Sequence, residues 1–204
     1  MRTVLVTGFG PFSDHADNPS ALAVDALARE WSAPDGVTLV AEALPVSFAR
    51  ATARVRALVA EHRPAVVVGA GLAAGRDRIS LERVALNLLD ARIPDVDGAQ
   101  PVDVPVVPGA PLARGTTLPV KAALAALRDA GLPAELSLSA GTYVCNAVMY
   151  AALEAVPEGV PAGFVHVPPA DVVPVADVAR ALALVLDTVL TTPVDVVVPG
   201  GRED

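Results

Sequence analysis

The sequence predicts an α/β protein: a single-domain α/β/α sandwich with a mostly parallel, twisted sheet and helices on both faces. Two observations favour this class. Short β-branched runs alternate with Ala-rich segments of helical period along the 204 residues. The sequence contains no internal repeat, no heptad pattern and no linker long enough to divide it into two domains. Single domains of this length are common, so we expect residues 1–204 to form one domain.

In the first half of the chain, apolar runs bounded by Gly, Pro or charged residues predict three strands, over residues 2–8, 37–44 and 64–71. Two Ala-rich segments between them predict helices over 18–31 and 47–62. Asn18 and Ser47 are residue types that cap helix N-termini, and Pro19 suits the first helical position. Strands joined by helices in this order indicate a parallel sheet.

The regular signals weaken between residues 76 and 111, where Pro, Gly and Asp are frequent and residues 79–95 alternate only partly like a strand. We interpret this stretch as an irregular excursion that carries site residues. Beyond position 111, strand patterns return over 134–139 and 163–168. Helical patterns cover 118–131, 143–156 and 176–190, with Gly131 ending the first of these helices.

The composition excludes several functional classes. A formal net charge of −8 argues against a nucleic-acid surface, which needs clustered Lys and Arg, and no apolar run approaches the ~18 residues of a membrane-spanning helix. The N-terminus goes from one basic residue directly into a strand-like run, unlike a signal peptide. A single cysteine cannot form an internal disulfide or a cysteine-based metal cluster, which fits a reducing compartment. We therefore expect a cytoplasmic protein without nucleic-acid or membrane partners.

The glycine-rich segment GAGLAAG, over residues 69–75, nearly matches a dinucleotide-binding fingerprint, because it follows a strand and Asp90 lies about twenty residues further on. The fingerprint also requires a helix that begins within the glycines and meets the pyrophosphate. The next residues, RDRISLERVALN, have no clear helical pattern. We favour a tight strand-to-loop turn and keep a dinucleotide-dependent enzyme as a lesser alternative.

The only cysteine, Cys145, lies near the start of the helix expected over 143–156. Free cysteines are usually buried, so a packing role is the first interpretation of this residue taken alone. If the helix begins near Thr142, Cys145 falls in its first turn, where unpaired N–H groups and the helix dipole favour a thiolate and lower its pKa. The same N–H groups could stabilise an oxyanion, so a nucleophile is the second interpretation.

A cysteine nucleophile needs a base that takes its proton and an acid that orients the base. His166 ends an apolar strand-like run just before two prolines, at the kind of strand end where ligands bind in open α/β sheets. His15 and His62 lie in polar surroundings that suit solvated side chains. Glu82, between apolar neighbours in the excursion, is the candidate acid. Taken alone, His166 also fits a core histidine, and Glu82 a surface or ion-paired residue.

Four segments, VLVTGFGPF…NPS, GRDRISLERVALNLLDARIPD…QP, SAGTYVCNAVMY and GFVHVP, together resemble the pyroglutamyl-peptidase I family, also called pyrrolidone-carboxylate peptidases. The resemblance spans residues 4–168. It implies a cysteine peptidase that removes an N-terminal pyroglutamyl residue from peptides, in the cytoplasm, without a cofactor and commonly as a homotetramer. The roles that it implies are nucleophile for Cys145, general base for His166, orienting acid for Glu82 and support of the oxyanion for Arg92.

The resemblance also implies a pocket for the pyroglutamyl lactam ring. Pyroglutamate has no free α-amine, and a flat, neutral lactam needs apolar walls with a few amide partners. Phe9 and Phe12 bracket a Gly-Pro turn directly after the first strand, which suits a rigid aromatic wall. The implied wall residues are Phe9 and Phe12, with Ile93, Tyr143, Val144 and Val148 as further candidates.

The sequence departs from the family's pattern at a few places, and none of them removes a residue of the implied catalytic set. Ser13 and Asp14 replace glycines that often follow the second Phe, and Leu72 stands where some members have glutamine. Leu138 replaces a usual polar residue, and PPADVVPVADVAR follows His166 in place of the family's usual continuation. These departures bear on substrate affinity and subunit packing more than on reaction type. A catalytically inactive binding protein on the same fold remains the competing class.

Overall fold

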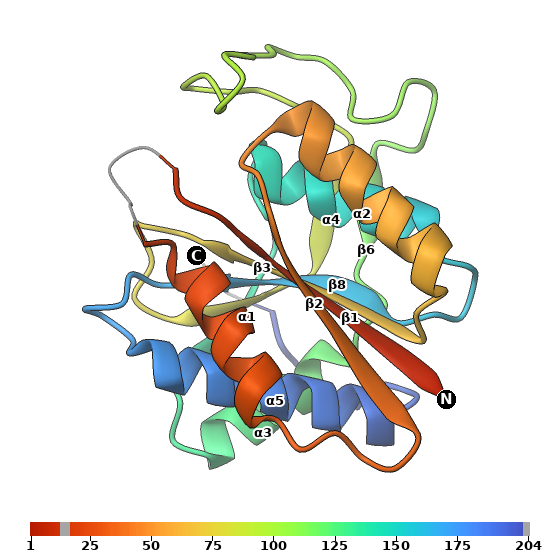
Figure 1. Cartoon of the computed structure of the whole chain (residues 1–204), viewed down its shortest axis with the longest axis vertical. Coiled ribbons are helices and arrows are strands. Elements are labelled where there is room, and N and C mark those ends of the chain that lie inside the picture. Colours follow the sequence, from red (N-terminus) through yellow and green to blue (C-terminus); the bar gives the residue numbers. More distant parts are fainter. Residues whose placement is uncertain (13–16, 202–204) are drawn as a thin grey trace.

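The computed structural model in Figure 1 describes residues 1–12 and 17–201. Within this part of the chain the main sheet has six strands: β1 (Arg2–Phe9), β2 (Val37–Leu44), β3 (Val66–Leu72), β4 (Ile79–Glu82), β7 (Ala134–Ser137) and β8 (Ala162–Val167). Their order in the sheet is β2-β1-β3-β8-β4-β7. The first four of these neighbours run parallel, whereas β4 pairs antiparallel with β8 and parallel with β7. The predicted mostly parallel sheet is confirmed.

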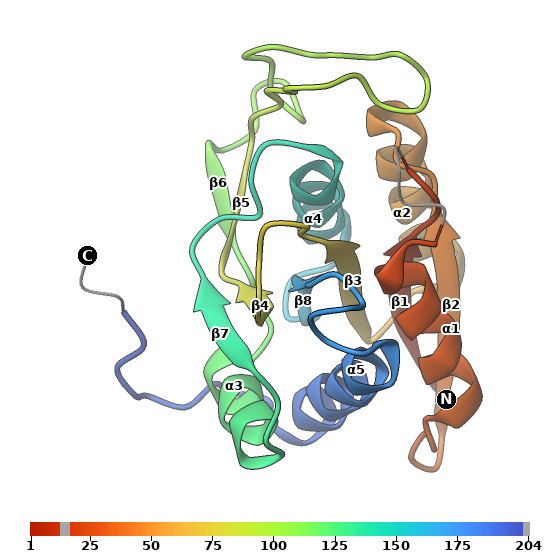
Figure 2. The same cartoon turned by 90° about the vertical axis from the view of Figure 1, so that its left-hand side faces the viewer.

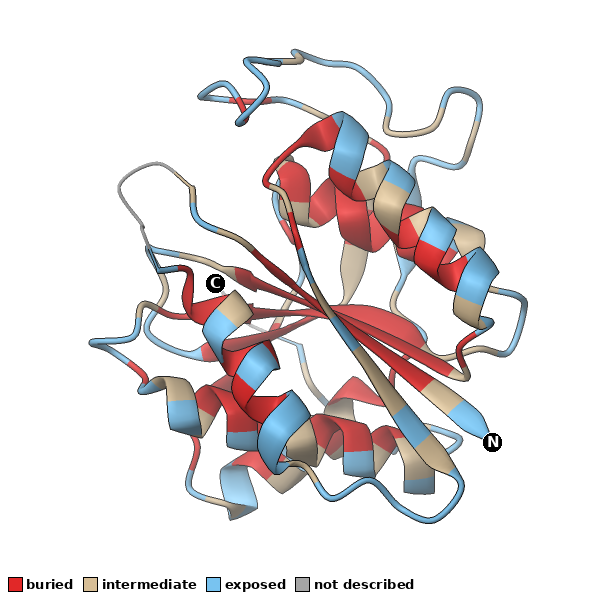
Figure 3. Cartoon of the chain, viewed as in Figure 1, coloured by how far each residue is buried: buried red, intermediate tan, exposed pale blue. Residues whose placement is uncertain are grey.

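Helices cover both faces of this sheet, as the two views in Figures 1 and 2 show. One face carries α1 (Pro19–Glu30), α3 (Val120–Asp129) and α5 (Val175–Thr191), and the other carries α2 (Phe48–His62) and α4 (Val144–Ala155). Each face buries its own apolar core against the strands. In Figure 3 the buried residues follow the sheet and the inward sides of the helices, while the outward sides are exposed. The α/β/α sandwich follows from this two-sided burial.

Local sequence signals account for the helix starts. The Asn18 side chain accepts a hydrogen bond from the backbone N–H of Ser20, and the Ser47 side chain accepts one from that of Arg50, so both predicted N-caps are confirmed. Gly131, predicted to end a helix, has a φ of 75°, which glycine adopts without steric cost. The helix expected to begin near Thr142 instead begins at Val144, after a Tyr143 N-cap.

Pairing within the sheet brings residues far apart in sequence onto one face. In the antiparallel β4–β8 pair, Glu82 lies opposite Phe164 and Ser80 lies opposite His166. Directly opposite residues point to the same face, and so do residues two positions apart on one strand. Glu82 and His166 are therefore diagonal neighbours on the same face, within reach of their side chains. Gly71 of β3 is the register partner of His166 on the other side of β8.

The irregular excursion, residues 76–111, is confirmed over residues 87–111; its first part contains β4 and a further short strand, and another short strand follows just after it. β5 (Val84–Leu86) and β6 (Ala113–Gly115) form a separate antiparallel pair, and β6 was not predicted because it is only three residues long and mostly exposed. The buried Asp95 carboxylate accepts a hydrogen bond of 2.9 Å from the backbone N–H of Phe48 at the start of α2. This contact holds the middle of the excursion against the helical face that carries α2.

No helix in residues 1–12 and 17–201 is long and apolar enough to cross a membrane.

Candidate active site

A cavity of about 460 Å³ opens at the carboxyl ends of β1 and β3, beside the N-terminus of α4. Its lining comes from the ends of β1 and β3, the connections that follow β1 and β2, the excursion and the start of α4: Phe9, Phe12, Asn18, Val46, Leu72, Ala74, Asp90, Arg92, Ile93, Thr142, Tyr143, Val144 and Cys145. Most of these side chains are apolar. Its position agrees with the general placement of ligand sites at the carboxyl edge of α/β sheets.

Five of the six expected wall residues line this cavity: Phe9, Phe12, Ile93, Tyr143 and Val144. The sixth, Val148, does not. It is 1% exposed and packs in the core one helical turn along α4 from Val144, which corrects its expected place in the wall. Arg92 also lines the cavity, from the exposed excursion.

The departures from the family's pattern fall in different surroundings. Leu72 ends β3 and is part of the cavity wall. Leu138 is 61% exposed and is not among the lining residues. Ser13 and Asp14 lie outside the described residues. Within the described part of the chain, the departure that touches the cavity is therefore Leu72, which adds to its apolar wall.

Aromatic contacts fix the shape of one wall. The Tyr143 ring packs against Phe12, with ring centroids 5.9 Å apart, and edge-on against Phe48 at 5.1 Å. The Tyr143 hydroxyl donates a hydrogen bond of 3.0 Å to the backbone carbonyl of Pro94 in the excursion. Burial, followed by the nearby charge of Asp95, raises the pKa of Tyr143 to about 12, so this residue is neutral at physiological pH. Tyr143 thus acts as a rigid, uncharged wall.

Cys145 is the second residue of α4 and lies at the cavity. The N-cap Tyr143 supplies no side-chain cap, in contrast to Asn18 and Ser47 at the starts of α1 and α2. The first backbone N–H groups of a helix have no intrahelical partner, so those of α4 are available toward the cavity. A developing negative charge on a ligand atom there would be stabilised by these donors.

Burial raises the pKa of the Cys145 thiol from 9.0 to about 12, and the charge of Glu82 acts in the same direction. The backbone N–H of Cys145 and the charge of Arg76 oppose this rise without cancelling it. The expectation that the helix N-terminus lowers this pKa is therefore wrong, because desolvation outweighs the helix end. Cys145 is a neutral thiol at physiological pH and needs a base to act as a nucleophile.

This pKa predicts how the free protein reacts with iodoacetamide. We expect the alkylation rate of Cys145 to keep rising beyond pH ~9, since only the thiolate reacts and its fraction grows about tenfold per pH unit below the pKa. Mass spectrometry of the native protein from about pH 6 to about pH 10 measures the rate, and the single cysteine makes the assignment unambiguous. The denatured protein, with an ordinary thiol, is the control. A rate that reaches its plateau below about pH 8 in the native protein would contradict the raised pKa.

His166 and Glu82 form a buried pair. The His166 Nδ1 and Glu82 Oε1 atoms are 2.7 Å apart, Glu82 is completely buried, and His166 is 5% exposed. The Phe164 ring contacts the His166 ring edge-on, with centroids 5.0 Å apart, and limits its rotation. Because Glu82 engages Nδ1, the other ring nitrogen, Nε2, is left for a further proton partner.

The glycines of β3 bring the thiol and the imidazole to adjacent positions. A Cβ atom at Gly71 would lie 2.7 Å from Cys145 Sγ and 2.9 Å from Phe164 Cζ, and one at Gly69 would lie 2.4 Å from Phe164 Cδ2. The Cys145 sulfur therefore lies directly over Gly71, the register partner of His166 on the neighbouring strand. The glycine-rich segment serves this close packing. No helix starts within residues 69–75, and a dinucleotide-binding fingerprint requires one there, so this segment does not form a dinucleotide-binding site of that kind.

Substituting Gly71→Ala is expected to lower catalytic activity by about 10²-fold, because the new methyl group displaces the Cys145 sulfur from its place beside His166. The free energy of unfolding of the variant is also expected to fall by about 1–3 kcal/mol, because the backbone at position 71 has to move away from Phe164. Steady-state kinetics and thermal unfolding measure the two effects. Gly75→Ala is the matched control, because a Cβ at Gly75 meets no atom within 4 Å. Wild-type kinetics in Gly71→Ala would refute the close packing of the sulfur.

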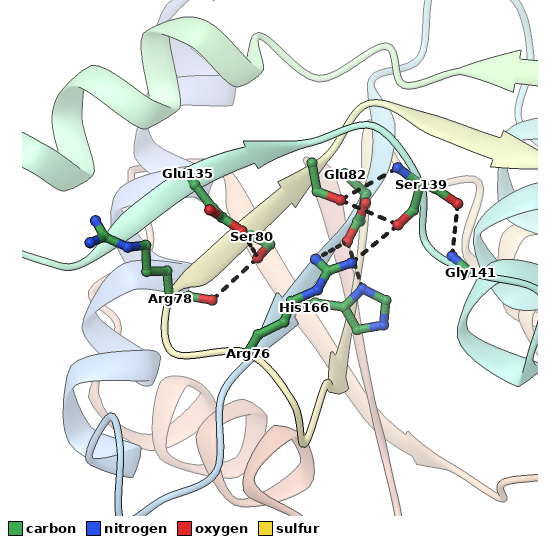
Figure 4. Close-up of polar contacts among 9 residues, drawn as sticks. Arg76, Arg78, Ser80, Glu82, Glu135, Ser139, Gly141 and His166 are labelled. Carbon is green, nitrogen blue, oxygen red and sulfur yellow. Dashed lines mark hydrogen bonds and ion pairs between the residues drawn. The ribbon is translucent and has the colours of Figure 1, made fainter. Parts of the chain in front are cut away.

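One charged residue of this cluster was not anticipated from the sequence. The Arg76 guanidinium donates a hydrogen bond of 2.6 Å from Nη1 to Glu82 Oε1 and one of 3.2 Å from Nη2 to the backbone carbonyl of Ser139, as Figure 4 shows. In the sequence Arg76 stands next to Asp77 and Arg78, so it reads as part of a solvated charged turn. The sequence did contain one indication: Glu82, six residues after Arg76, lies between apolar residues, and a buried carboxylate needs a positively charged or hydrogen-bonding partner.

A cysteine in the first turn of a helix, on the same side of the sheet as an imidazole paired with a carboxylate, is the set of groups that hydrolases with a cysteine nucleophile use to attack carbonyl groups. The pyroglutamyl peptidase family model matches residues 2–197 of the chain. The chain belongs to this family.

Individual relatives agree with the family match. The chain is 43% identical to a pyrrolidone-carboxylate peptidase of Escherichia fergusonii, with 98% of this chain and 99% of that protein aligned. It is 48% identical to one of Pseudomonas fluorescens strain SBW25, over 82% of this chain and 79% of the relative. Among solved structures, pyroglutamyl peptidase I from Bacillus amyloliquefaciens superposes with a TM-score of 0.90 at 33% identity, covering 97% of this chain and 99% of that chain. The predicted family is confirmed.

Proposed function

We propose that this chain is a cysteine peptidase that removes the N-terminal pyroglutamyl residue from peptides, with Cys145 as nucleophile, His166 as general base and acid, and Glu82 as the acid that orients His166. The observation that carries this assignment is that three residues distant in sequence come together behind one wall of the apolar cavity, which His166 and Glu82 themselves do not line. Cys145 lines the cavity, His166 is the strand neighbour of the glycine under its sulfur, and Glu82 holds His166 through Nδ1.

The first chemical step forms an acyl-enzyme. His166 Nε2 takes the proton of the neutral Cys145 thiol as the sulfur attacks the pyroglutamyl carbonyl carbon, which gives a tetrahedral oxyanion. The unpaired backbone N–H groups in the first turn of α4, that of Cys145 included, stabilise this charge, and Arg92 supports it from the cavity wall. The oxyanion collapses, the C–N bond breaks, and protonated His166 gives its proton to the leaving amine.

The second step releases pyroglutamate. His166 takes a proton from water, the resulting hydroxide attacks the thioester carbonyl, and the Cys145 thiolate leaves and recovers its proton from His166. Glu82, at 2.7 Å from His166 Nδ1, stabilises the imidazolium that forms in each half-reaction. Side chains of the chain thus carry every proton, and we expect the reaction to need no cofactor.

The cavity fits the chemistry of the first residue. A pyroglutamyl ring is uncharged, so walls such as Phe9, Phe12 and Tyr143 can bury its faces without stranding a charge. Tyr143 itself is held neutral by its raised pKa. Asn18 and Asp90 are polar residues of the lining that could meet the polar edge of the ring or the peptide that follows it.

The direct test compares a pyroglutamyl anilide with the matching prolyl anilide, using purified protein under reducing conditions. We expect release from the pyroglutamyl compound alone, because a charged prolyl ring would lose its hydration against the apolar walls formed by Phe9, Phe12 and Tyr143, whereas the neutral lactam would not. Release from neither compound, together with tight binding of a pyroglutamyl peptide, would favour the inactive binding protein. Release from both would contradict the lactam-specific pocket.

We further propose that residues 1–204 form a single cytoplasmic domain that assembles into homotetramers. The lone cysteine fits a reducing compartment. Large apolar side chains are exposed in the excursion and near the C-terminus, with exposed fractions of 61% for Val102, 78% for Leu112 and 99% for Val197, and burial between copies would remove them from water. Light scattering coupled to size-exclusion chromatography gives the mass; a monomer at micromolar concentration would refute the assembly.

A further inference from the structure

Glu82 is an unusual carboxylate because only one of its oxygens has partners. Oε1 is 2.6 Å from Arg76 Nη1 and 2.7 Å from His166 Nδ1, whereas no described residue forms a hydrogen bond to the buried Oε2. An ionised carboxylate in a fully buried position is costly unless charged or polar groups compensate it. Among the described residues, the groups that compensate the Glu82 carboxylate are the Arg76 guanidinium and the His166 imidazole, and both contact the same oxygen, Oε1.

We propose that Arg76 is a positioning residue of the active site, which sets the charge that Glu82 presents to His166 and fixes the turn before the nucleophile helix. This inference rests on the proposed roles of Cys145, His166 and Glu82. Arg76 is not among the cavity-lining residues, and its hydrogen bonds go to Glu82 and to the Ser139 carbonyl, so in this proposal it acts through these two partners and not on the substrate directly.

The first action is electrostatic. Elements packed against β8 present two titratable side chains to His166, Glu82 from β4 and Cys145 from α4, while β3 presents none; Arg76 joins them from the β3–β4 connection. Arg76 and His166 share the same carboxylate oxygen, so the cation partly neutralises Glu82. Without it, the buried anion would either hold a proton on His166, which removes the free base that Cys145 needs, or take up a proton itself, which removes the charge that stabilises the imidazolium.

The second action is mechanical. Through Nη2, Arg76 holds the carbonyl of Ser139, which lies in the turn that leads into α4. The Ser139 hydroxyl in turn accepts a hydrogen bond of 3.1 Å from the backbone N–H of Gly141. One guanidinium, shown in Figure 4 between Glu82 and this turn, therefore ties the acid to the segment that places the nucleophile. A planar group with two donors can do this, and a lysine ammonium cannot match its geometry.

The test measures kcat/KM against pH for the pyroglutamyl anilide in the wild type, Arg76→Gln, Arg76→Lys and the control Arg78→Gln. Arg78 lies two residues away with its side chain 54% exposed. For Arg76→Gln we expect the acid limb to move to higher pH by about one unit, with kcat/KM at the optimum about 10–100-fold lower and KM changed little. For Arg76→Lys the acid limb stays in place because the charge remains, but kcat falls. Arg78→Gln matches the wild type.

Separate outcomes bear on the two levels of the proposal. An inactive wild type contradicts the proposed function itself. An active wild type with an unmoved acid limb in Arg76→Gln, or with wild-type kcat in Arg76→Lys, overturns the role of Arg76. A variant that merely loses packing would lower thermal stability without moving the limb. Should Arg76→Gln fail to fold, NMR titration of the His166 ring in Arg76→Met, which also removes the charge, still decides: a pH midpoint above that of the wild type supports the charge role, and an unchanged one overturns it.

Discussion

Replacing Cys145 with serine is expected to lower turnover of a pyroglutamyl anilide by about 10⁴-fold or more while the protein stays folded. In the proposed mechanism the thiol gives its proton to His166 during attack, and its pKa, although raised to about 12, is still well below that of a serine hydroxyl. The helix N-terminus and the cavity are unchanged in the variant, so binding of the lactam persists.

Three measurements check this prediction in the Cys145→Ser protein. Anilide hydrolysis gives the loss of kcat, thermal unfolding gives the stability, and calorimetry with a pyroglutamyl peptide gives the affinity. Iodoacetamide provides an independent route, because Cys145 is the only thiol in the chain and its alkylation should abolish activity in step. Activity within tenfold of the wild type in Cys145→Ser, or survival of activity after complete alkylation, would remove Cys145 from the mechanism.

Glu82→Gln is expected to lower kcat by about 10³–10⁴-fold with little change in KM. The amide has nearly the same shape as the carboxylate but no charge, so it neither fixes the His166 tautomer with a proton on Nδ1 nor stabilises the imidazolium. KM is insensitive because Glu82 does not line the cavity. A second cost is structural, since the variant leaves the Arg76 cation without its anionic partner.

The control for this variant is Glu61→Gln, on the exposed surface of α2, which should match the wild type in kcat and stability. Kinetics of both variants, measured with thermal unfolding, separate the catalytic from the structural effect. A loss of activity in Glu82→Gln that only parallels unfolding would assign Glu82 a packing role. A large rise in KM at unchanged kcat would mean that Glu82 acts on substrate binding.

The sequence predicted the elements well where local physics decides them. Asn18 and Ser47 cap their helices as expected because an N-cap depends on residues within one turn. The antiparallel placement of β4 could not be predicted, since strand direction depends on which chain segments meet in the sheet. That placement is what puts Glu82 diagonally beside His166. The carboxylate–imidazole pair was therefore a hypothesis from residue type and resemblance alone.

The pKa of Cys145 and the role of Arg76 could not be predicted from the sequence either, because both depend on the three-dimensional fold. Position in a helix suggested a lowered pKa for Cys145, but desolvation, which raises it, depends on how tightly β3 and Phe164 close around the sulfur. Arg76 looked like part of an exposed turn, and only the three-dimensional path of the β3–β4 connection turns it toward Glu82. Burial and long-range charge pairs are properties of the assembled fold.

The position of β8 in the sheet has a consequence for the order of folding. β8 comes last of the strands in the chain, yet it lies between β3 and β4, so the β4–β7 pair cannot join the rest of the sheet until β8 has been made and inserted. During synthesis, a growing chain that ends before residue 162 lacks His166. Without β8, the edge of β3 and the edge of β4 that pair with it in the finished sheet are both left open. Such non-local closure is slow compared with helix formation. In the mechanism proposed above, peptidase activity can therefore appear only after β8 has been inserted into the sheet and has carried His166 to its place beside Glu82.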